Sequence, residues 1–218
     1  MTMATSTDSL ARLLQLASPA LPVGAYSYSG GLEAAVEAGI VSDAASAERW
    51  IGDVLEQAVA RMEVPVLWRM MHEPGALKRW NEFFLASRET AELRAETVQM
   101  GYSLARLLAD LGVGKIELDE PSFPAAFAFA VSAWKVDPRA ALQAYLWAWL
   151  ENQAMAAVKS VPLGQTEAQA MLLRLGGRLS KIAEQVAAME DDELANFTPG
   201  LAILSTRHET QYSRLFRS

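Results

Sequence analysis

Two long segments of this sequence carry apolar side chains at alternating intervals of four and three residues. The positions in the first segment are Leu93, Thr97, Met100, Leu104, Leu107 and Leu111. Those in the second segment are Ala168, Leu172, Leu175, Leu179, Ile182, Val186 and Met189. Residues three and four apart share one face of an α-helix, so each segment predicts a helix with a single buried stripe. No stretch of the sequence shows the period-two alternation of a half-buried β-strand, and the pattern therefore predicts an all-α fold.

The region between these two segments predicts helices that are buried on every side. Residues 123–131 and 137–161 are nearly apolar around the whole helical circumference, which is typical of a helix in the middle of a bundle or at a subunit contact. Asp137 and Pro138 predict the start of the second of these helices, because Asp favours the N-cap and Pro the first helical position. The linker candidate, residues 112–121, is short. We therefore expect one domain over residues 1–218, a bundle of about ten helices.

Serine and threonine residues predict where two further helices begin. Ser42 or Ser46 is expected to cap the helix that follows it. Thr166 and Gln169 have the spacing of a capping box, in which each side chain bonds the other's backbone N–H. The second long helix is therefore expected to begin near Thr166.

Proline and glycine residues predict further breaks and close contacts. Pro65 and Pro74 are expected at the beginnings of two short helices, where a missing N–H costs nothing. Gly176 and Gly177 fall inside the second long helix, where they are expected to allow close helix packing.

Residues 18–33, with the sequence SPALPVGAYSYSGGLE, interrupt the helical pattern. The prolines fix φ and remove N–H donors, and the glycines allow positive φ. The segment also carries Tyr26 and Tyr28. A loop specified to this degree, directly followed by an apolar helical pattern, predicts either a rigid corner or a binding surface.

The last residues of the chain combine arginines with aromatic and aliphatic side chains. Residues 205–218, STRHETQYSRLFRS, are basic within an acidic protein. This composition is typical of interface hot spots, so we expect these residues to form a tail that docks on a partner protein. The alternative is a last helix packed on its own domain.

A third marked segment, residues 159–165, predicts a tight corner between two helices. Lys159 is expected to reach the surface from an otherwise apolar helix.

The composition argues against several classes of protein. The chain of 218 residues has a formal net charge of −7, no cysteine and two histidines. The acidic balance argues against binding to nucleic acid or to an anionic membrane surface. The lack of cysteine and scarcity of histidine argue against a tight metal site of its own. Residues 1–8 do not resemble a signal peptide, and charged residues interrupt every apolar stretch before the ~20 residues that a membrane span needs. We expect a cytoplasmic protein without a cofactor.

No constellation typical of an active site stands out. The sequence lacks a phosphate-binding loop, a Ser/His/Asp set and the H-E-x-x-H spacing. His72 beside Glu73 is read as a solvated helix end, since adjacent residues of a helix do not face each other. The alternative is a helical enzyme with a hydrophobic pocket between helices, in which His72 or His208 acts as the acid or base.

Three of these segments together resemble the urease accessory protein UreF family. The resemblance lies in residues 18–33, 159–165 and 205–218, and weaker likeness extends through residues 88–108 and 122–128. It implies an all-helical, non-catalytic chaperone of urease assembly that forms a homodimer. It also implies three partners: a UreD-type accessory protein (also called UreH), the nickel-carrying GTPase UreG and apo-urease. Regulation of this GTPase for nickel insertion into urease is the function that the resemblance predicts.

The predicted partner-binding residues come from the same three segments. They are expected to contact the other accessory proteins or a second copy of the chain, and no catalytic, cofactor or metal-binding residue is assigned. The set is Tyr26, Tyr28, Lys159, Arg207, His208, Glu209, Tyr212, Arg214, Leu215, Phe216 and Arg217.

Overall fold

A computed structural model describes residues 7–218 as an all-α bundle, which confirms the predicted fold class. No β-strand occurs within that range. The helices are α1 (Thr7–Leu16), α2 (Leu32–Glu37), α3 (Ala44–Val54), α4 (Val64–His72), α5 (Leu77–Ala86), α6 (Ala91–Asp110), α7 (Phe123–Ala133), α8 (Pro138–Ser160), α9 (Gln165–Gly176), α10 (Leu179–Ala188) and α11 (Pro199–His208). The other helical elements are the 3₁₀ turns η1 (Ala25–Ser27), η3 (Pro74–Ala76) and η4 (Asp191–Glu193) and the nine-residue π-helix η2 (Leu55–Glu63).

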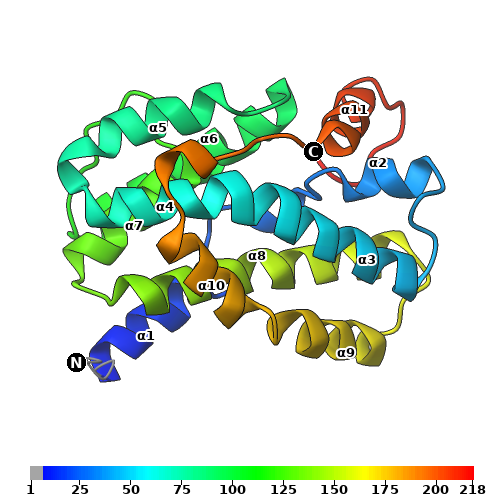
Figure 1. The fold of residues 1–218 in the computed structure, drawn as a ribbon, viewed down its shortest axis with the longest axis horizontal. Coiled ribbons are helices and arrows are strands. Elements are labelled where there is room, and N and C mark those ends of the chain that lie inside the picture. The colour runs from blue at the N-terminus through cyan, green and yellow to red at the C-terminus, as the bar shows by residue number, and fades with distance from the viewer. Residues whose placement is uncertain (1–6) are drawn as a thin grey trace.

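Helix α8 is the centre of the bundle, as its apolar circumference predicted. It contacts α1, α2, α3, α4, α9 and α10, and Figure 1 shows these helices arranged around it. Leu142, Leu146 and Leu150 on this helix are almost completely buried. Although it is long, neither α8 nor any other helix of residues 7–218 has the length and hydropathy required to cross a membrane.

Pro65 lies in the first turn of the nine-residue helix α4, as expected, but α4 does not begin after a break in the chain. Helix α3, η2 and α4 follow one another without a gap, and η2 is π-helical. A proline ring inside an α-helix clashes with the carbonyl four residues earlier. The wider turn accommodates Pro65 within a continuous helix, since the N–H of Val64 bonds to Val59, five residues back. Pro74 also lies where the sequence predicted a helical start, because η3 begins there and leads into α5.

The predicted helix from Thr166 to Met189 is two helices. Helix α9 ends at Gly176 and α10 begins at Leu179. The expected close packing is confirmed at Gly176, where an added Cβ would lie 3.2 Å from the Trp147 ring. Gly177 does not take part in this contact but is the C-cap residue that follows α9. The local periodicity continues across this break, so it gave no sign of the interruption.

Two predicted helix caps are displaced by a few residues. Asp43, rather than Ser42 or Ser46, caps α3, and Ser46 completes the capping box from the third helical position. Gly164 precedes α9, and the carboxylate of Glu167 accepts its N–H at 3.1 Å. Thr166 therefore lies inside the first turn of the helix rather than at its cap.

Asp137 caps α8 as predicted, and its loss should weaken the central helix. Its Oδ1 accepts the N–H of Ala140 at 2.9 Å. We expect Asp137→Ala to lower the free energy of unfolding by about 1 kcal/mol, the usual cost of an N-cap. Urea unfolding followed by circular dichroism measures this change. An unchanged midpoint would mean that solvent replaces the cap without loss.

The C-terminal end of the chain folds back onto the bundle. Helix α11 lies beside α2, and the chain then returns so that the C-terminus lies close to both (Figure 1). Residues 209–218, called the C-terminal segment below, pass over η1 and the start of α2, since Arg217 N–H donates to the Ser27 carbonyl at 2.8 Å. This docked segment carries most of the residues that the sequence predicted to bind a partner.

Candidate functional site

The carboxylate of Glu33 holds the C-terminal segment against the bundle. Its Oε1 accepts the N–H of Leu215 at 2.6 Å, and its Oε2 accepts the N–H of Phe216 at 2.9 Å. The Oε2 atom also lies 3.1 Å from Nε2 of His208. Glu33 lies in the first turn of α2 and is 7% exposed. Hydrogen bonds to an ionised group are stronger than those between neutral groups, so this buried carboxylate is the principal attachment of the segment.

The glycine pair before Glu33 explains how the carboxylate reaches this position. Gly31 has a φ of 85° at the N-cap of α2, a left-handed conformation that favours glycine. A Cβ at Gly31 would lie 2.6 Å from Cδ1 of Leu201 on α11. The chain therefore turns sharply into α2 while α11 packs directly against the turn.

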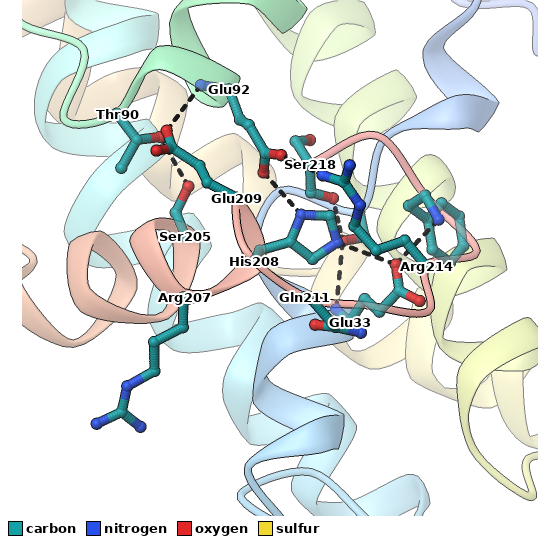
Figure 2. A network of polar contacts seen from close by, with 12 residues as sticks. Glu33, Thr90, Glu92, Ser205, Arg207, His208, Glu209, Gln211, Arg214 and Ser218 are labelled. Carbon is teal, nitrogen blue, oxygen red and sulfur yellow. Dashed lines mark hydrogen bonds and ion pairs between the residues drawn. The ribbon is translucent and has the colours of Figure 1, made fainter.

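His208 is completely buried between two carboxylates from different helices (Figure 2). Its Nδ1 lies 2.7 Å from Oε2 of Glu92, on the opposite side of the ring from Glu33. The other oxygen of Glu92 accepts a hydrogen bond from Arg214 at 2.6 Å. The network joins α2, α6 and α11 to the C-terminal segment, so its members depend on one another.

The last residue that the structure describes is also fixed. Ser218 is 1% exposed, and Ser29 donates both its N–H, at 2.9 Å, and its hydroxyl to the main-chain oxygen of Ser218. The hydroxyl of Ser218 donates to Oε2 of Glu96 at 2.6 Å. Burial raises the pKa of Glu96 to about 7. The hydrogen bond from Ser218 opposes this rise in the pKa, because it stabilises the ionised carboxylate.

The three segments singled out in the sequence meet in space. The Nζ of Lys159 lies 6.0 Å from the centre of the Tyr26 ring and 5.5 Å from that of Phe216. A cation over an aromatic face is a favourable arrangement. The corner at residues 159–165, the loop at residues 18–33 and the C-terminal segment therefore form one surface.

The predicted partner-binding residues divide into a buried and an exposed group. Tyr28 is buried in the loop before α2. His208 and Phe216 are also buried, so this end of the chain packs on its own domain, as in the alternative to a partner-binding tail. Arg214 and Arg217 bond to Glu92 and Gln99 respectively. Glu209 Oε1 accepts the N–H of Ala91 at the start of α6. Glu209, Arg214 and Arg217 are exposed as well, although they form these bonds. The other exposed residues, called the exposed group below, are Tyr26, Lys159, Arg207, Tyr212 and Leu215.

The exposed group remains accessible to another protein. Tyr26 is 68% exposed and Leu215 is 72% exposed, and Tyr212 is fully exposed. Figure 2 shows Arg207 directed away from the buried network. Large apolar side chains held at the surface beside cations are typical of protein interfaces, so partner binding by this group stays a prediction with an accessible surface to support it.

Sequence reasoning missed the groups that receive the C-terminal segment. Glu33 lies in the recognised motif, but Glu92 and Glu96 lie in an ordinary helical pattern and Ser29 in a loop. No local spacing relates these positions to the last residues of the chain. Buried carboxylates need partners, so the surplus of arginines at the end of an acidic chain was the one available signal.

A partly open pocket of about 190 Å³ lies next to this network. Apolar residues line most of it, and Glu63, Arg88 and Tyr145 lie along one side. Tyr145 donates to Oε1 of Glu63 at 2.6 Å, and Arg88 donates to Oε2 at 3.3 Å. Burial and the nearby Glu63 raise the pKa of Tyr145. Tyr145 and Arg88 both bond to Glu63, so these polar groups stabilise one another within the fold.

Neither histidine lines this pocket. His72 is exposed at the end of α4, stacks on Trp68 at 3.9 Å and donates from Nδ1 to the Trp68 carbonyl. His208 lies in the network of the C-terminal segment. The two features required by the enzyme alternative, a pocket and a histidine base, are therefore in different places. Within residues 7–218, no cluster of three His, Cys, Asp or Glu side chains is arranged to hold a metal ion.

The chain is similar to proteins named as urease accessory proteins. The family model described as UreF matches residues 41–176. A urease accessory protein UreF of Azoarcus sp. (strain BH72) is 57% identical, with the match covering 96% of this chain and 95% of that relative. Another from Janthinobacterium sp. (strain Marseille) is 50% identical, over 97% of this chain and 99% of that relative. The matches to these two relatives span nearly the full length of this chain and of each relative.

Proposed function

The chain belongs to the UreF family of urease accessory proteins, and we propose that it is a non-catalytic adapter that assembles the machinery of urease maturation. Its partners in this proposal are a UreD-type accessory protein, the GTPase UreG and apo-urease. The adapter recruits and regulates the GTPase, which delivers nickel to apo-urease. A homodimer of the chain in the cytoplasm is the form that acts.

The exposed group supports an adapter role. Lys159 lies beside Tyr26, while Arg207 and Tyr212 line a shallow surface pocket at α2, and the backbone of Leu215 is held by Glu33 of the same helix. Aromatic and arginine side chains dominate binding energy at protein interfaces. An adapter needs such a rigid contact surface, and it does not need an activated nucleophile.

Substitution of the exposed side chains should weaken capture of the partner proteins. We expect Tyr212→Ala with Leu215→Ser to weaken binding of the UreD-type protein at least about tenfold, because two exposed anchors are removed. Point variants are preferable to truncation, since truncation would also remove the buried Phe216. Binding of the purified proteins is measured by calorimetry, with nickel-dependent urease activation as a second measurement.

The matched control is Leu173→Ser on α9. Leu173 is 79% exposed, comparable to Leu215, but lies on helix α9 rather than in the C-terminal segment. It should bind the partner like the unsubstituted protein. Equal binding by the double variant and the control would place the partner contact elsewhere on the molecule.

A further inference from the structure

One side-chain amide in the partly open pocket of about 190 Å³ lacks a hydrogen-bond partner. Gln153, on α8, lines this pocket and is 3% exposed, yet its side chain forms no hydrogen bond with any residue from 7 to 218. Its Nε2 lies beside Gly30, another residue of the lining, where an added Cβ would be only 3.3 Å away. Burial of an unpartnered polar group is costly, so this amide indicates that the pocket receives a hydrogen-bonding ligand.

The charged side chains that line the pocket carry an excess of negative charge. They are three carboxylates, Glu63, Glu96 and Glu151, and one guanidinium, Arg88. Arg88 bonds to Glu63, whereas Glu96 and Glu151, both half-buried, form no ion pair within the described part of the chain. Burial raises the pKa of both groups, that of Glu96 to about 7, and a cation beside these carboxylates would offset this effect. The pocket is therefore suited to a positively charged ligand.

The hydrogen-bonding atoms left over in the lining are mainly acceptors. Glu96 uses Oε2 to accept the hydroxyl of Ser218, which leaves its Oε1 without a donor among residues 7–218. Asn152 uses its NH₂ group to donate to the Tyr28 carbonyl, which leaves its Oδ1. The Gln153 amide adds another oxygen. A ligand that supplies several N–H donors matches this set.

The remainder of the lining is apolar and leaves room for an aromatic ring. It includes Met62, Met100, Phe123, Trp149 and Met155. An apolar cavity of about 150 Å³ in another protein binds benzene, so this pocket accommodates a ring together with a small charged group. Aromatic faces and methionine side chains also suit such a ligand, since aromatic faces attract cations and methionine packs against rings.

We propose that this pocket binds a small organic cation with an apolar body, of the class of the arylamidinium ions. The cation donates its N–H groups to the free acceptor atoms of the lining, and its ring packs on the apolar wall. A metal ion fits the pocket less well, because no three His, Cys, Asp or Glu side chains of residues 7–218 are arranged to hold one. The proposal concerns the chain alone and does not depend on the partners proposed above.

Benzamidine is the probe, because it joins an aromatic ring to a planar cation. Titration of the full chain at about pH 8, above the pKa of Glu96, should give a Kd on the order of 1 mM or lower. In methyl NMR spectra, the signals of Met62, Met100 and Met155 should shift, and that of Met171, which lies on α9 outside the lining, should not. Benzamide has the same shape without the charge, and should bind at least about tenfold more weakly.

Substitution of the unpaired carboxylates tests the role of charge. Glu96→Gln keeps an acceptor for the Ser218 hydroxyl and should weaken benzamidine binding at least about tenfold. Glu151→Gln should weaken it severalfold, and this variant still tests the proposal if Glu96→Gln does not fold. Glu184→Gln is the matched control, because it removes an exposed carboxylate of α10 outside the lining and should bind benzamidine like the unsubstituted chain.

Four results would overturn the cation site. They are no binding at about 10 mM benzamidine, equal affinity for benzamide and benzamidine, methyl shifts that spare the three lining methionines, and carboxylate variants of the pocket that bind no more weakly than Glu184→Gln.

Discussion

Replacing Glu33 by glutamine should release the C-terminal segment and lower the free energy of unfolding by about 3 kcal/mol. The buried carboxylate accepts the N–H groups of Leu215 and Phe216 and faces the ring of His208. A glutamine has one acceptor oxygen, and its NH₂ group would be directed at donors. Loss of one member of a buried charged network typically costs several kcal/mol, because the remaining groups keep the cost of leaving water.

Two measurements check this expected result. Urea unfolding gives the change in stability, and hydrogen exchange at the Leu215 and Phe216 amides reports whether the segment has detached. Glu37→Gln is the matched control, because Glu37 is an exposed residue of the same helix and loses the same charge. If both variants unfolded at the same urea concentration, Glu33 would not be the principal attachment of the segment.

Adding a single methyl group at Gly101 should lower the free energy of unfolding about as much as Glu33→Gln does, because of steric overlap. Helix α6 approaches the start of α7 so closely that a Cβ at Gly101 would lie 1.9 Å from the carbonyl oxygen of Pro121. That backbone is itself fixed, since Ser122 N–H donates to Asn81 and Phe123 N–H to Thr97. We expect Gly101→Ala to destabilise the protein by about 3 kcal/mol or more, against a helix-propensity gain of only about 1 kcal/mol.

Gly200→Ala is the matched control for this substitution. Gly200 also lies in a helix, α11, but an added Cβ would meet no heavy atom within 4 Å. Alanine should stabilise the protein there by about 0.5 kcal/mol, because it restricts the unfolded chain without a clash. Thermal and urea unfolding of both variants give the comparison. A small effect of Gly101→Ala would mean that α6 and α7 can separate at little cost.

The elements predicted most accurately are those defined by interactions between near neighbours. The first long stripe became α6, and the apolar circumference of residues 137–161 became the central helix α8. The cap at Asp137 was correct because a side chain and an N–H three residues away form it. The predictions were less accurate where the helix geometry changes although the apolar pattern continues. The π-helical turn before Pro65 and the break after Gly176 both lie within helices whose local pattern is continuous.

The three marked segments were singled out in the sequence without an expectation that they would be adjacent. In the structure, Lys159 lies beside Tyr26 and Phe216. The sequence could not show that Phe216 would be buried and Tyr212 exposed, because both residues belong to one irregular segment without a helical or strand period. Which side chain faces inward there depends on the surface that receives it.

The amino-acid sequence alone determined the fold class, the position of the central helix and membership of the family, since periodicity, caps and motifs are local properties. The tertiary structure decided that the chain's end docks on its own bundle. That arrangement depends on Glu33 meeting Leu215 across 182 positions of sequence and on Glu96 meeting Ser218 across 122. No rule of local spacing relates such residues; only the packing of α2, α6 and α11 brings the carboxylates to the segment that they hold.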